Sequence, residues 1–291
     1  EVAPSQHELA PIFTTTNVAT DHNQLTMDVM KKVACKHGLM CLLHEKPFAG
    51  VNGSGKHNNW SISTDTGKNI LSPGKDPINN KVFLTFLVAI IKAVHENQDL
   101  LRISVADAGN DHRLGGNEAP PAILSMFIGT DLEKVLKCIE ENLPYNEETL
   151  NSLAIDVGVL PSFKKDTTDR NRTSPFAFTG NKFEFRMLGS TANIACPNTI
   201  LNTIVAESLD YVSDYIEGKD DIDKALNEIL KKILKEHKAI IFNGNNYAPE
   251  WVVEAESRGL LNLKSSAEAL PHYTDEKNIK LFEKHGVYTK L

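Results

Sequence analysis

The chain has 291 residues, with 31 Lys and Arg against 38 Asp and Glu, a formal net charge of -7 and 41% hydrophobic residues. This length allows one large domain or two ordinary ones, and the composition excludes disordered, collagen-like and coiled-coil proteins. An acidic chain without a dense run of Lys and Arg is a poor match for a nucleic-acid backbone. The longest apolar run, 83–91, is far shorter than the roughly 20 residues that cross a bilayer. We therefore expect neither nucleic acid nor a membrane as a partner.

The four cysteines follow no spacing that is typical of a zinc site, a redox motif or a small disulfide scaffold. We therefore expect reduced thiols in a cytoplasmic protein. The sequence starts at Glu1 inside a dense polar motif, which we interpret as the beginning of a fragment from a longer protein.

The first predicted element is a helix over residues 20–37. Its apolar side chains recur at helical spacing, Thr20 or Asp21 can cap its start, and Gly38 can end it. The apolar run Leu39–Leu43 follows and has the length of a strand.

A glycine-rich loop comes next, and Gly50–Lys56 fits the first positions of a phosphate-binding P-loop. His57 stands where that motif needs Ser or Thr, and the segment 57–64 alternates like a strand instead of opening a helix. We therefore reject a P-loop. Two interpretations stay open: a flexible turn, or a loop whose glycines let the backbone approach a substrate. The polar face of the strand would hold His57, Asn59, Ser61 and Ser63.

The rest of the chain alternates between helical patterns and short strands. Helices are expected over 82–95, 130–142, 199–217, 221–237 and 248–258. Residues 100–108 are ambiguous between helix and strand, 107–121 has the composition of a loop, and Thr130–Glu133 matches a capping box. A final polar stretch runs to residue 291. No repeat is detectable, so an α/β or α+β class is expected.

Residues 176–179 and 182–187 flank Gly180–Asn181, which is typical of a tight hairpin. Side chains two apart on a strand share a face. One face would hold Lys182, Glu184 and Arg186, and the other Phe183, Phe185 and Met187.

The charged face of this hairpin has two interpretations. It can be a solvated face with an internal ion pair, or it can bind an anionic group. The second interpretation gains support from Asp169–Arg172 just upstream, because guanidinium groups bind carboxylates and phosphates in a bidentate way.

A third cluster lies at Glu1, His7 and Glu8, where Pro4 interrupts any regular strand. Together with His57 and Glu184 the chain offers carboxylates and an imidazole, a donor set suited to Mg²⁺ or Mn²⁺. No spacing rule alone joins these distant residues into one site.

Four motifs in order show a specific resemblance. They are Glu1–Glu8; Lys46–Pro47 with Asn52–His57; Asn110–Gly115 with Glu118–Pro120; and Asp169–Arg172 with Phe183–Arg186. In content and order they resemble glutamine synthetase over roughly residues 1–265, and Arg172–Lys182 looks like its type III class.

This resemblance implies an α+β fold in which a curved antiparallel sheet, flanked by helices, forms a funnel. Nucleotide would enter at one end and glutamate at the other, with divalent metals between them. It implies a catalytic domain over residues 1–218, incomplete at its N-terminus, and a helical extension over 219–291 packed on it.

The resemblance also implies roles for single residues. Metal ligands would be Glu1, Glu8, His57 and Glu184; substrate-binding residues Asn52, Gly53, Arg113 and Arg186; nucleotide-binding residues Ser61 and Lys182; and catalytic residues Glu118 and Arg172. Glu118 would be the acid of a flap that helps to deprotonate ammonium, and Arg172 would stabilise the phosphoryl group during transfer.

The implied reaction is ATP-dependent ligation of ammonia to glutamate through a γ-glutamyl phosphate, which gives glutamine, ADP and phosphate. Activation by ATP is needed because a carboxylate is a poor electrophile, and two or more Mg²⁺ or Mn²⁺ ions would neutralise the crowded phosphate oxygens. Relatives of this kind imply a cytoplasmic ring of identical subunits, such as a dodecamer.

The sequence departs from the family pattern in two places. It is one residue shorter between Arg113 and Glu118, and Ala177 stands where many relatives have an arginine. Because the family's preceding segment supplies further metal carboxylates, we expect residues 1–291 alone to be inactive. Two alternatives stay open: a ligase that joins glutamate to another amine, and a non-catalytic relative that forms a ring scaffold.

Overall fold

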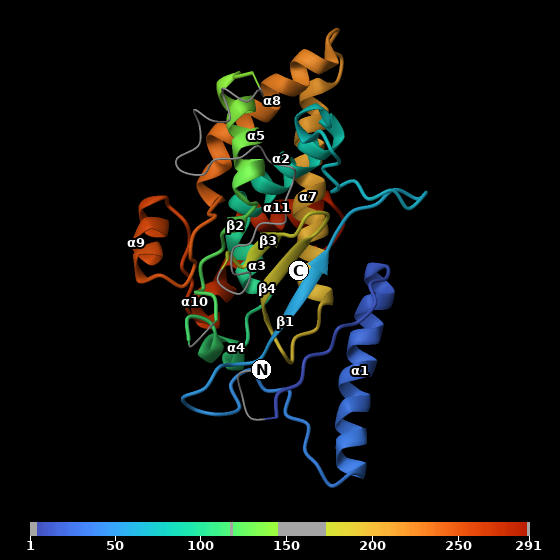
Figure 1. The fold of residues 1–291 in the computed structure, drawn as a ribbon, viewed down its shortest axis with the longest axis vertical. Coiled ribbons are helices and arrows are strands. Elements are labelled where there is room, and N and C mark those ends of the chain that lie inside the picture. The colour runs from blue at the N-terminus through green and yellow to red at the C-terminus, as the bar shows by residue number, and fades with distance from the viewer. Residues whose placement is uncertain (1–4, 117–118, 145–172, 290–291) are drawn as a thin grey trace.

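A four-stranded sheet lies at the centre of the molecule (Figure 1). This computed structural model describes residues 5–116, 119–144 and 173–289. The strands are β1 (Gly55–Trp60), β2 (Met126–Phe127), β3 (Phe176–Phe178) and β4 (Phe183–Gly189), in the spatial order β1-β4-β3-β2. The expected α+β class, with an open curved sheet flanked by helices, is confirmed.

One pairing in the sheet differs from the antiparallel expectation. β4 runs antiparallel to both β1 and β3, whereas β2 and β3 are parallel. The chain between β2 and β3 is long and includes a helix, and a parallel pair needs such a crossover connection. The predicted hairpin between β3 and β4 is confirmed, with Gly180 at φ +98° and the Thr179 N–H donating to the Lys182 carbonyl at 2.9 Å.

The helices surround this sheet and pack on one another. They are α1 (Thr16–Lys36), α2 (Lys81–Glu96), α3 (Gln98–Ile103), α4 (Ala108–Arg113), α5 (Thr130–Glu141), α7 (Ala195–Ile216), α8 (Ile222–His237), α9 (Pro249–Ser257), α10 (Ser266–Ala269) and α11 (Glu276–Lys284), with short 3-10 turns η1 (Pro77–Asn79), η3 (Lys238–Ile240) and η4 (Leu270–Thr274). α2 packs against α7 and α8, and α5 packs on α8. Among the described residues no helix combines the length and the apolar character needed to cross a membrane.

The buried face of the sheet is built from phenylalanines. The rings of Phe176 and Phe183 stack with centroids 4.8 Å apart, and Phe178 contacts Phe83 of α2 with centroids 6.0 Å apart. Phe83, Phe176 and Phe183 are fully buried. Burying side chains of this size contributes roughly 1.5–3 kcal/mol each, so this face fixes the sheet against α2.

The inner face of β1 is tied to α7 by polar contacts. Asn58 donates to Oδ1 of Asn198 and the indole of Trp60 donates to Oδ1 of Asn202, both at 2.9 Å. Asn58 and Trp60 are buried, and their hydrogen bonds offset the cost of placing polar groups in the core. The opposite face of β1 is thereby turned away from the core.

The N-terminal part differs from the sequence prediction in two ways. α1 begins at Thr16 instead of Thr20 or Asp21, and it ends before Gly38 at φ +69° as expected. No residue of α1 is buried, and Leu25, Val29 and Val33 are among its exposed apolar side chains. The helix lies beside β1 (Figure 1). The strand expected at Leu39–Leu43 was wrong, because this segment pairs with no strand among the described residues.

A short helix replaces part of the loop expected over 107–121. α4 forms because the Asp107 carboxylate accepts the N–H groups of Gly109 (2.8 Å) and Asn110 (3.3 Å), which caps the first turn. Six residues are too few for a periodic apolar pattern, so the sequence pattern did not reveal it. The ambiguous segment 100–108 begins inside helix α3.

The start of α5 and the C-terminal stretch also differ from the predictions. Gly129 and not Thr130 occupies the position before α5, and no side chain caps it, so the predicted capping box was wrong. Instead Oδ1 of Asn243 accepts the N–H groups of Ile128 and Gly129. The expected polar tail contains α10 and α11, and the helix α10 begins with a capping box between Ser265 and Glu268.

A histidine pair lies where α2 meets the end of α8. Nδ1 of His95 and Nδ1 of His237 are 3.0 Å apart. Burial is the largest influence, and it lowers the pKa of both imidazoles. The Glu96 carboxylate acts in the opposite direction on both pKa values. Lys92 lowers the pKa of His237 further, and Glu236 raises it. The folded protein therefore favours two neutral rings.

This pair predicts a loss of stability at mildly acidic pH. The unfolded chain binds protons near pH 6.5 and the folded chain only at lower pH, so stability is complete above about pH 6.5 and falls as the pH decreases below it. We expect the His237→Gln variant to show a weaker decrease of melting temperature between pH 7.5 and 5.5 than the unaltered chain. The exposed His22→Gln serves as the control, and an identical pH dependence in all three proteins would contradict this prediction.

Candidate active site

β1 and β4 run side by side with one irregularity near their centre. The register shifts between Lys56 and Asn58, so His57 alone lies opposite Arg186 and Met187. A β-bulge of this kind bends the strand and re-aims neighbouring side chains, and bulges are common beside active sites. It brings His57 close to Arg186 although they are far apart in the sequence.

The polar face of these two strands carries the alternation that the sequence predicts. His57 and Asn59 are exposed, whereas Asn58 and Trp60 are buried. Asn59 pairs with Glu184 across the ladder, and cross-strand partners share a face. His57, Asn59 and Glu184 therefore lie on the face opposite the phenylalanine core.

Glu184 and Arg186 form an ion pair on this face. Arg186 donates from Nε (3.2 Å) and Nη2 (2.9 Å) to Oε2 of Glu184, and from Nη1 to the Thr173 hydroxyl at 2.6 Å. The two charged side chains are only 7% and 17% exposed, so water screens their attraction weakly. Of the two interpretations of this face, the internal ion pair is present, and its Arg186 is buried instead of solvated.

The charges around His57 show which predicted residues surround it. Burial is the largest cause that lowers the pKa of His57; Arg186 and Arg113 also lower it, whereas Glu184 and Glu8 raise it. Four predicted site residues, Arg186, Glu184, Arg113 and Glu8, are thus close enough to act on its charge. A lowered pKa keeps the imidazole neutral near pH 7, which is the form that binds a metal ion.

The two predicted nucleotide-binding residues lie at the turn between β3 and β4, where Ser61 is bonded to the residue before Lys182. The Ser61 hydroxyl donates to the Asn181 carbonyl at 2.8 Å, and Asn69 donates to the same carbonyl at 2.9 Å and to the Ser61 hydroxyl at 3.1 Å. The half-buried Lys182 follows Asn181 directly. Ser61 and Lys182 therefore lie at one end of the β1–β4 pair.

The glycine-rich loop lies at the other end. A Cβ atom on Gly53 would lie 2.7 Å from the Glu45 carbonyl oxygen and 2.9 Å from Cγ of Arg113. A Cβ atom on Gly55 would collide with the Arg113 guanidinium. Asn52 in the same loop is buried. Close packing against Glu45 and Arg113 explains Gly53 and Gly55, whereas Gly50 has a turn conformation at φ +75° with open space around it. The approach of this loop to a substrate stays a prediction.

Arg113 holds the end of β4 in this structure. Its guanidinium donates to Oδ1 of Asn110 at 3.1 Å and to the carbonyls of Arg186 (3.1 Å), Leu188 (3.2 Å) and Met187 (3.4 Å). A helix side chain is thereby bound to the strand that carries Glu184. The binding of a substrate carboxylate by Arg113 and Arg186 stays a prediction.

Several predicted residues are not placed by the structure. Glu1, Glu118 and Arg172, together with most of the Asp169–Arg172 cluster and its surroundings, lie outside the described residues. Glu8 is described and exposed. Their predicted roles are therefore untested.

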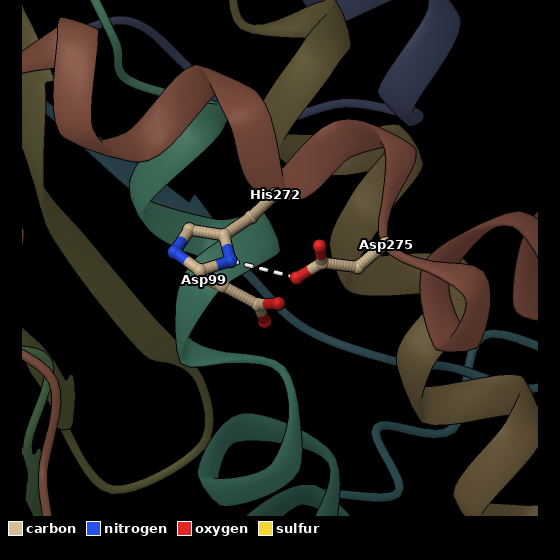
Figure 2. Close-up of side chains that lie close together, drawn as sticks. All are labelled: Asp99, His272 and Asp275. Atoms are coloured by element: carbon tan, nitrogen blue, oxygen red, sulfur yellow. Dashed lines mark hydrogen bonds and ion pairs between the residues drawn. The ribbon is translucent and has the colours of Figure 1, made fainter.

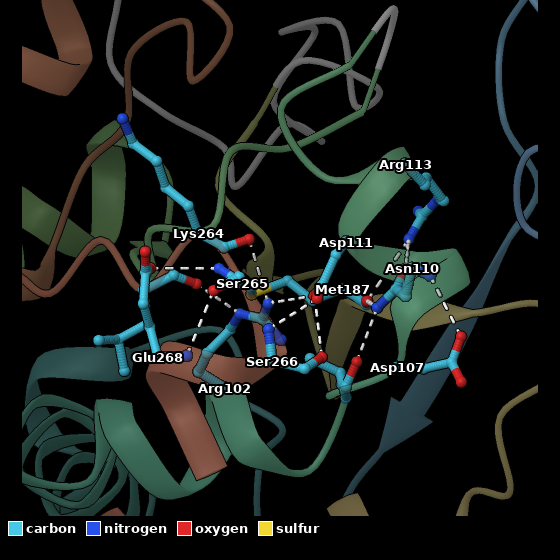
Figure 3. Close-up of polar contacts among 12 residues, drawn as sticks. Arg102, Asp107, Asn110, Asp111, Arg113, Met187, Lys264, Ser265, Ser266 and Glu268 are labelled. Carbon is cyan, nitrogen blue, oxygen red and sulfur yellow. Dashed lines mark hydrogen bonds and ion pairs between the residues drawn. The ribbon is translucent and has the colours of Figure 1, made fainter. Parts of the chain in front are cut away.

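The sequence motifs missed a network that joins α4 to α10 (Figure 3). Arg102, only 2% exposed, donates to Oδ1 of Asp111 at 2.6 Å and to the Leu263 carbonyl at 2.8 Å. Asp111 also accepts from the backbone N–H (2.6 Å) and the hydroxyl (3.0 Å) of Ser266. Asp111 belongs to the motif Asn110–Gly115, but Ser266 lies 155 residues away and no motif includes Arg102.

Two compact groups of possible metal ligands lie elsewhere. Among the described residues, the groups whose ligand atoms all lie within 4.8 Å of one another are Asp99, His272 and Asp275, drawn in Figure 2, and Glu207, Asp210 and His285. Lys277 lies 2.8 Å from Oδ2 of Asp99, and Lys284 lies 2.5 Å from Oε2 of Glu207. Lysine therefore neutralises Asp99 in the first group and Glu207 in the second, and Asp275 is paired with His272 within its own group. The ligand atoms of Glu8, His57 and Glu184 do not all lie within 4.8 Å of one another. These three side chains would have to move closer together to bind one cation.

Comparisons with known proteins identify the family. A family model described as "Glutamine synthetase, catalytic domain" matches residues 1–106, and one described as "Glutamine synthetase C-terminal domain" matches residues 225–291. A "Type-3 glutamine synthetase" of Dictyostelium discoideum is 52% identical over 100% of this chain and 40% of its own length. The chain belongs to the glutamine synthetase family. Membership explains why the four sequence motifs occur together and in this order.

Further relatives agree with this family. A "Glutamine synthetase" of Butyrivibrio fibrisolvens is 54% identical over 100% of this chain and 41% of its own length. A solved structure, "Apo GmaS without ligand", matches 90% of this chain and 52% of its own with a TM-score of 0.44 and 14% identity, a likeness too distant to place residues. The chain spans about two fifths of the length of these two glutamine synthetases.

Proposed function

We propose that the protein containing this chain is a glutamate–ammonia ligase. It would use ATP to convert glutamate into γ-glutamyl phosphate, which ammonia then attacks to give glutamine, ADP and phosphate. Membership of the glutamine synthetase family supports the reaction class.

The order of side chains along β1 and β4 is the observation that supports this proposal best. Ser61 and Lys182 lie at one end, His57 and Glu184 in the middle, and the glycine-rich loop with Arg113 at the other end. A strand of this length spans roughly 20 Å, which suits a nucleotide and an amino acid placed end to end. The transferred phosphoryl group would then lie near His57 and Glu184.

Divalent cations fit the donor set in the middle of this row. Glu8 and Glu184 offer carboxylates and His57 a neutral imidazole, which are ligands that suit Mg²⁺ or Mn²⁺. When bound, the cations would offset the charge of the phosphate oxygens. Glu184 is already ion-paired with Arg186, so we expect Glu184 to be shared between that guanidinium and a cation.

The arginines would bind and orient the anionic substrates. Arg113 and Arg186 are proposed to bind the glutamate carboxylate, since both guanidiniums lie on the β4 side of the site. Arg172 is proposed to stabilise the phosphoryl group, and Glu118 to exclude water and accept a proton from ammonium.

The assembly and organisation of the protein are also proposals. Residues 1–218 would form the catalytic part and 219–291 a helical extension; α8 of the latter packs on α2 and α5. We propose a cytoplasmic ring of identical subunits, in line with the family resemblance.

The direct test is product formation by the full-length protein with ATP, glutamate and ammonium, with Mg²⁺ and Mn²⁺ supplied separately. We expect glutamine and ADP in equal amounts, and ammonium preferred over methylamine in competition. Preference for methylamine would favour the alternative of a ligase for another amine. Absence of any product with either metal would contradict the proposal and favour a scaffold.

A further inference from the structure

Glu45 is a buried carboxylate next to the candidate site. It is 2% exposed, and Asp99 is the other buried acid among the described residues. Asp99 is ion-paired with Lys277, whereas no Lys, Arg or His in the described part of the chain forms an ion pair with Glu45. Burying a carboxylate without a paired cation costs free energy, so other contacts must hold it in place.

Three glycines from three segments press against Glu45. A Cβ atom on Gly189 would lie 2.5 Å from Oε1 of Glu45, one on Gly109 would lie 2.6 Å from Oε2, and one on Gly53 would lie 2.7 Å from its carbonyl oxygen. None of these three glycines has a positive φ. Closeness to Glu45, and not turn geometry, therefore explains why these positions lack a side chain.

Hydrogen bonds fix Glu45 between the same segments. Oε1 accepts the Thr191 N–H at 2.8 Å and also the Thr191 hydroxyl. The Glu45 carbonyl accepts the Ser54 N–H at 2.7 Å. Glu45 is thus hydrogen-bonded to the glycine-rich loop and to the segment after β4, and it lies against Gly109 of α4. The loop carries the predicted site residues Asn52 and Gly53, and α4 carries Arg113.

The charge of Glu45 acts on the cations at this end of the site. Burial lowers the pKa of Arg113 to about 10, whereas Tyr247 and, to a smaller extent, Glu45 raise this pKa. Burial also lowers the pKa of Lys56 to about 8, and Glu45 again opposes the change. Glu45 therefore favours the protonated form of Arg113 without occupying its donors.

We propose that Glu45 is a positioning residue for the glutamate end of the site. Its carboxylate holds α4, the glycine-rich loop and the end of β4 in one arrangement, and so sets where Arg113 meets the substrate carboxylate. This inference rests on the proposed ligase function. It predicts an effect on glutamate and not on ATP, because Ser61 and Lys182 lie at the other end of β1 and β4.

The test is the Glu45→Gln variant of the full-length protein, which keeps the shape and removes the charge. We expect KM for glutamate to rise about tenfold while KM for ATP stays within about twofold. Thr191→Val, which removes one hydroxyl donor to Glu45, should change KM for glutamate in the same direction by about threefold. It provides the test if Glu45→Gln does not fold.

Asp99→Asn is the matched control, because it alters the other buried acid, which lies away from the site. It should lower the melting temperature and leave both KM values unchanged. Two results would contradict the positioning role if the unaltered protein makes glutamine. In the first, Glu45→Gln and Thr191→Val both keep KM for glutamate within about twofold of the original value. In the second, both variants raise KM for glutamate and KM for ATP equally. If the unaltered protein makes no glutamine, the ligase proposal itself fails and the inference fails with it.

Discussion

Replacing Glu184 with Gln in the full-length protein should reduce glutamine formation by about 1,000-fold, because the centre of the site loses a carboxylate that would bind a cation. The amide oxygen of Gln can still accept the hydrogen bonds that Arg186 donates to Oε2. The melting temperature should therefore fall less than after a change to Ala, which removes these hydrogen bonds as well as the charge. Steady-state rates and thermal unfolding of the purified variant are the measurements.

Two further variants separate charge from packing at this position. Glu184→Ala should lose activity to the same extent and also unfold at a lower temperature, since it leaves the Arg186 guanidinium, 6% exposed, without this carboxylate. Glu276→Gln changes an exposed acid on α11 and should keep full activity. A Glu184→Gln protein with more than about a tenth of the original rate would remove Glu184 from the cation site.

Replacing Asp111 with Ala should destabilise the fold more than any surface change. Arg102 would keep its charge in the core without the carboxylate 2.6 Å away, and breaking a buried pair costs about 3–5 kcal/mol. The Ser266 N–H and hydroxyl would lose their acceptor as well. Urea unfolding should show a midpoint shift of corresponding size.

A double replacement tests the reason for this loss. Arg102→Met combined with Asp111→Ala removes the uncompensated charge, so part of the lost stability should return. Asp28→Ala removes an exposed ion pair on α1 and should leave the unfolding midpoint unchanged. Additive losses in the double variant would show that Arg102 and Asp111 do not act as a pair.

Short-range patterns predicted the two strands that carry the candidate site. The two-residue period of Lys182, Glu184 and Arg186 placed these side chains opposite the phenylalanines, and the structure agrees, because alternation depends only on neighbours in the chain. The same reasoning placed His57 and Asn59 on the polar face of β1. The prediction that these two strands lie together in one site came from the family resemblance, because their spacing in the sequence does not indicate it.

Features that depend on distant partners escaped the sequence patterns. A single Glu before Lys46 gives no local sign of burial, since the glycines that enclose Glu45 are 8, 64 and 144 residues further along the chain. Leu39–Leu43 has strand composition, but a strand needs a neighbour to pair with. The capping box at Thr130 was wrong because Thr130 is the first residue of the helix and Gly129, which has no side chain to accept a hydrogen bond, stands before it.

The central claim is that His57 and Glu184 hold a divalent cation on the polar face of β1 and β4. A crystal of the full-length protein grown with Mn²⁺, and the anomalous scattering of that ion, tests it most directly. The account predicts a peak about 2.0–2.3 Å from both His57 and Glu184. Peaks confined to other places, such as the group of Asp99, His272 and Asp275, or no peak near His57, would contradict it.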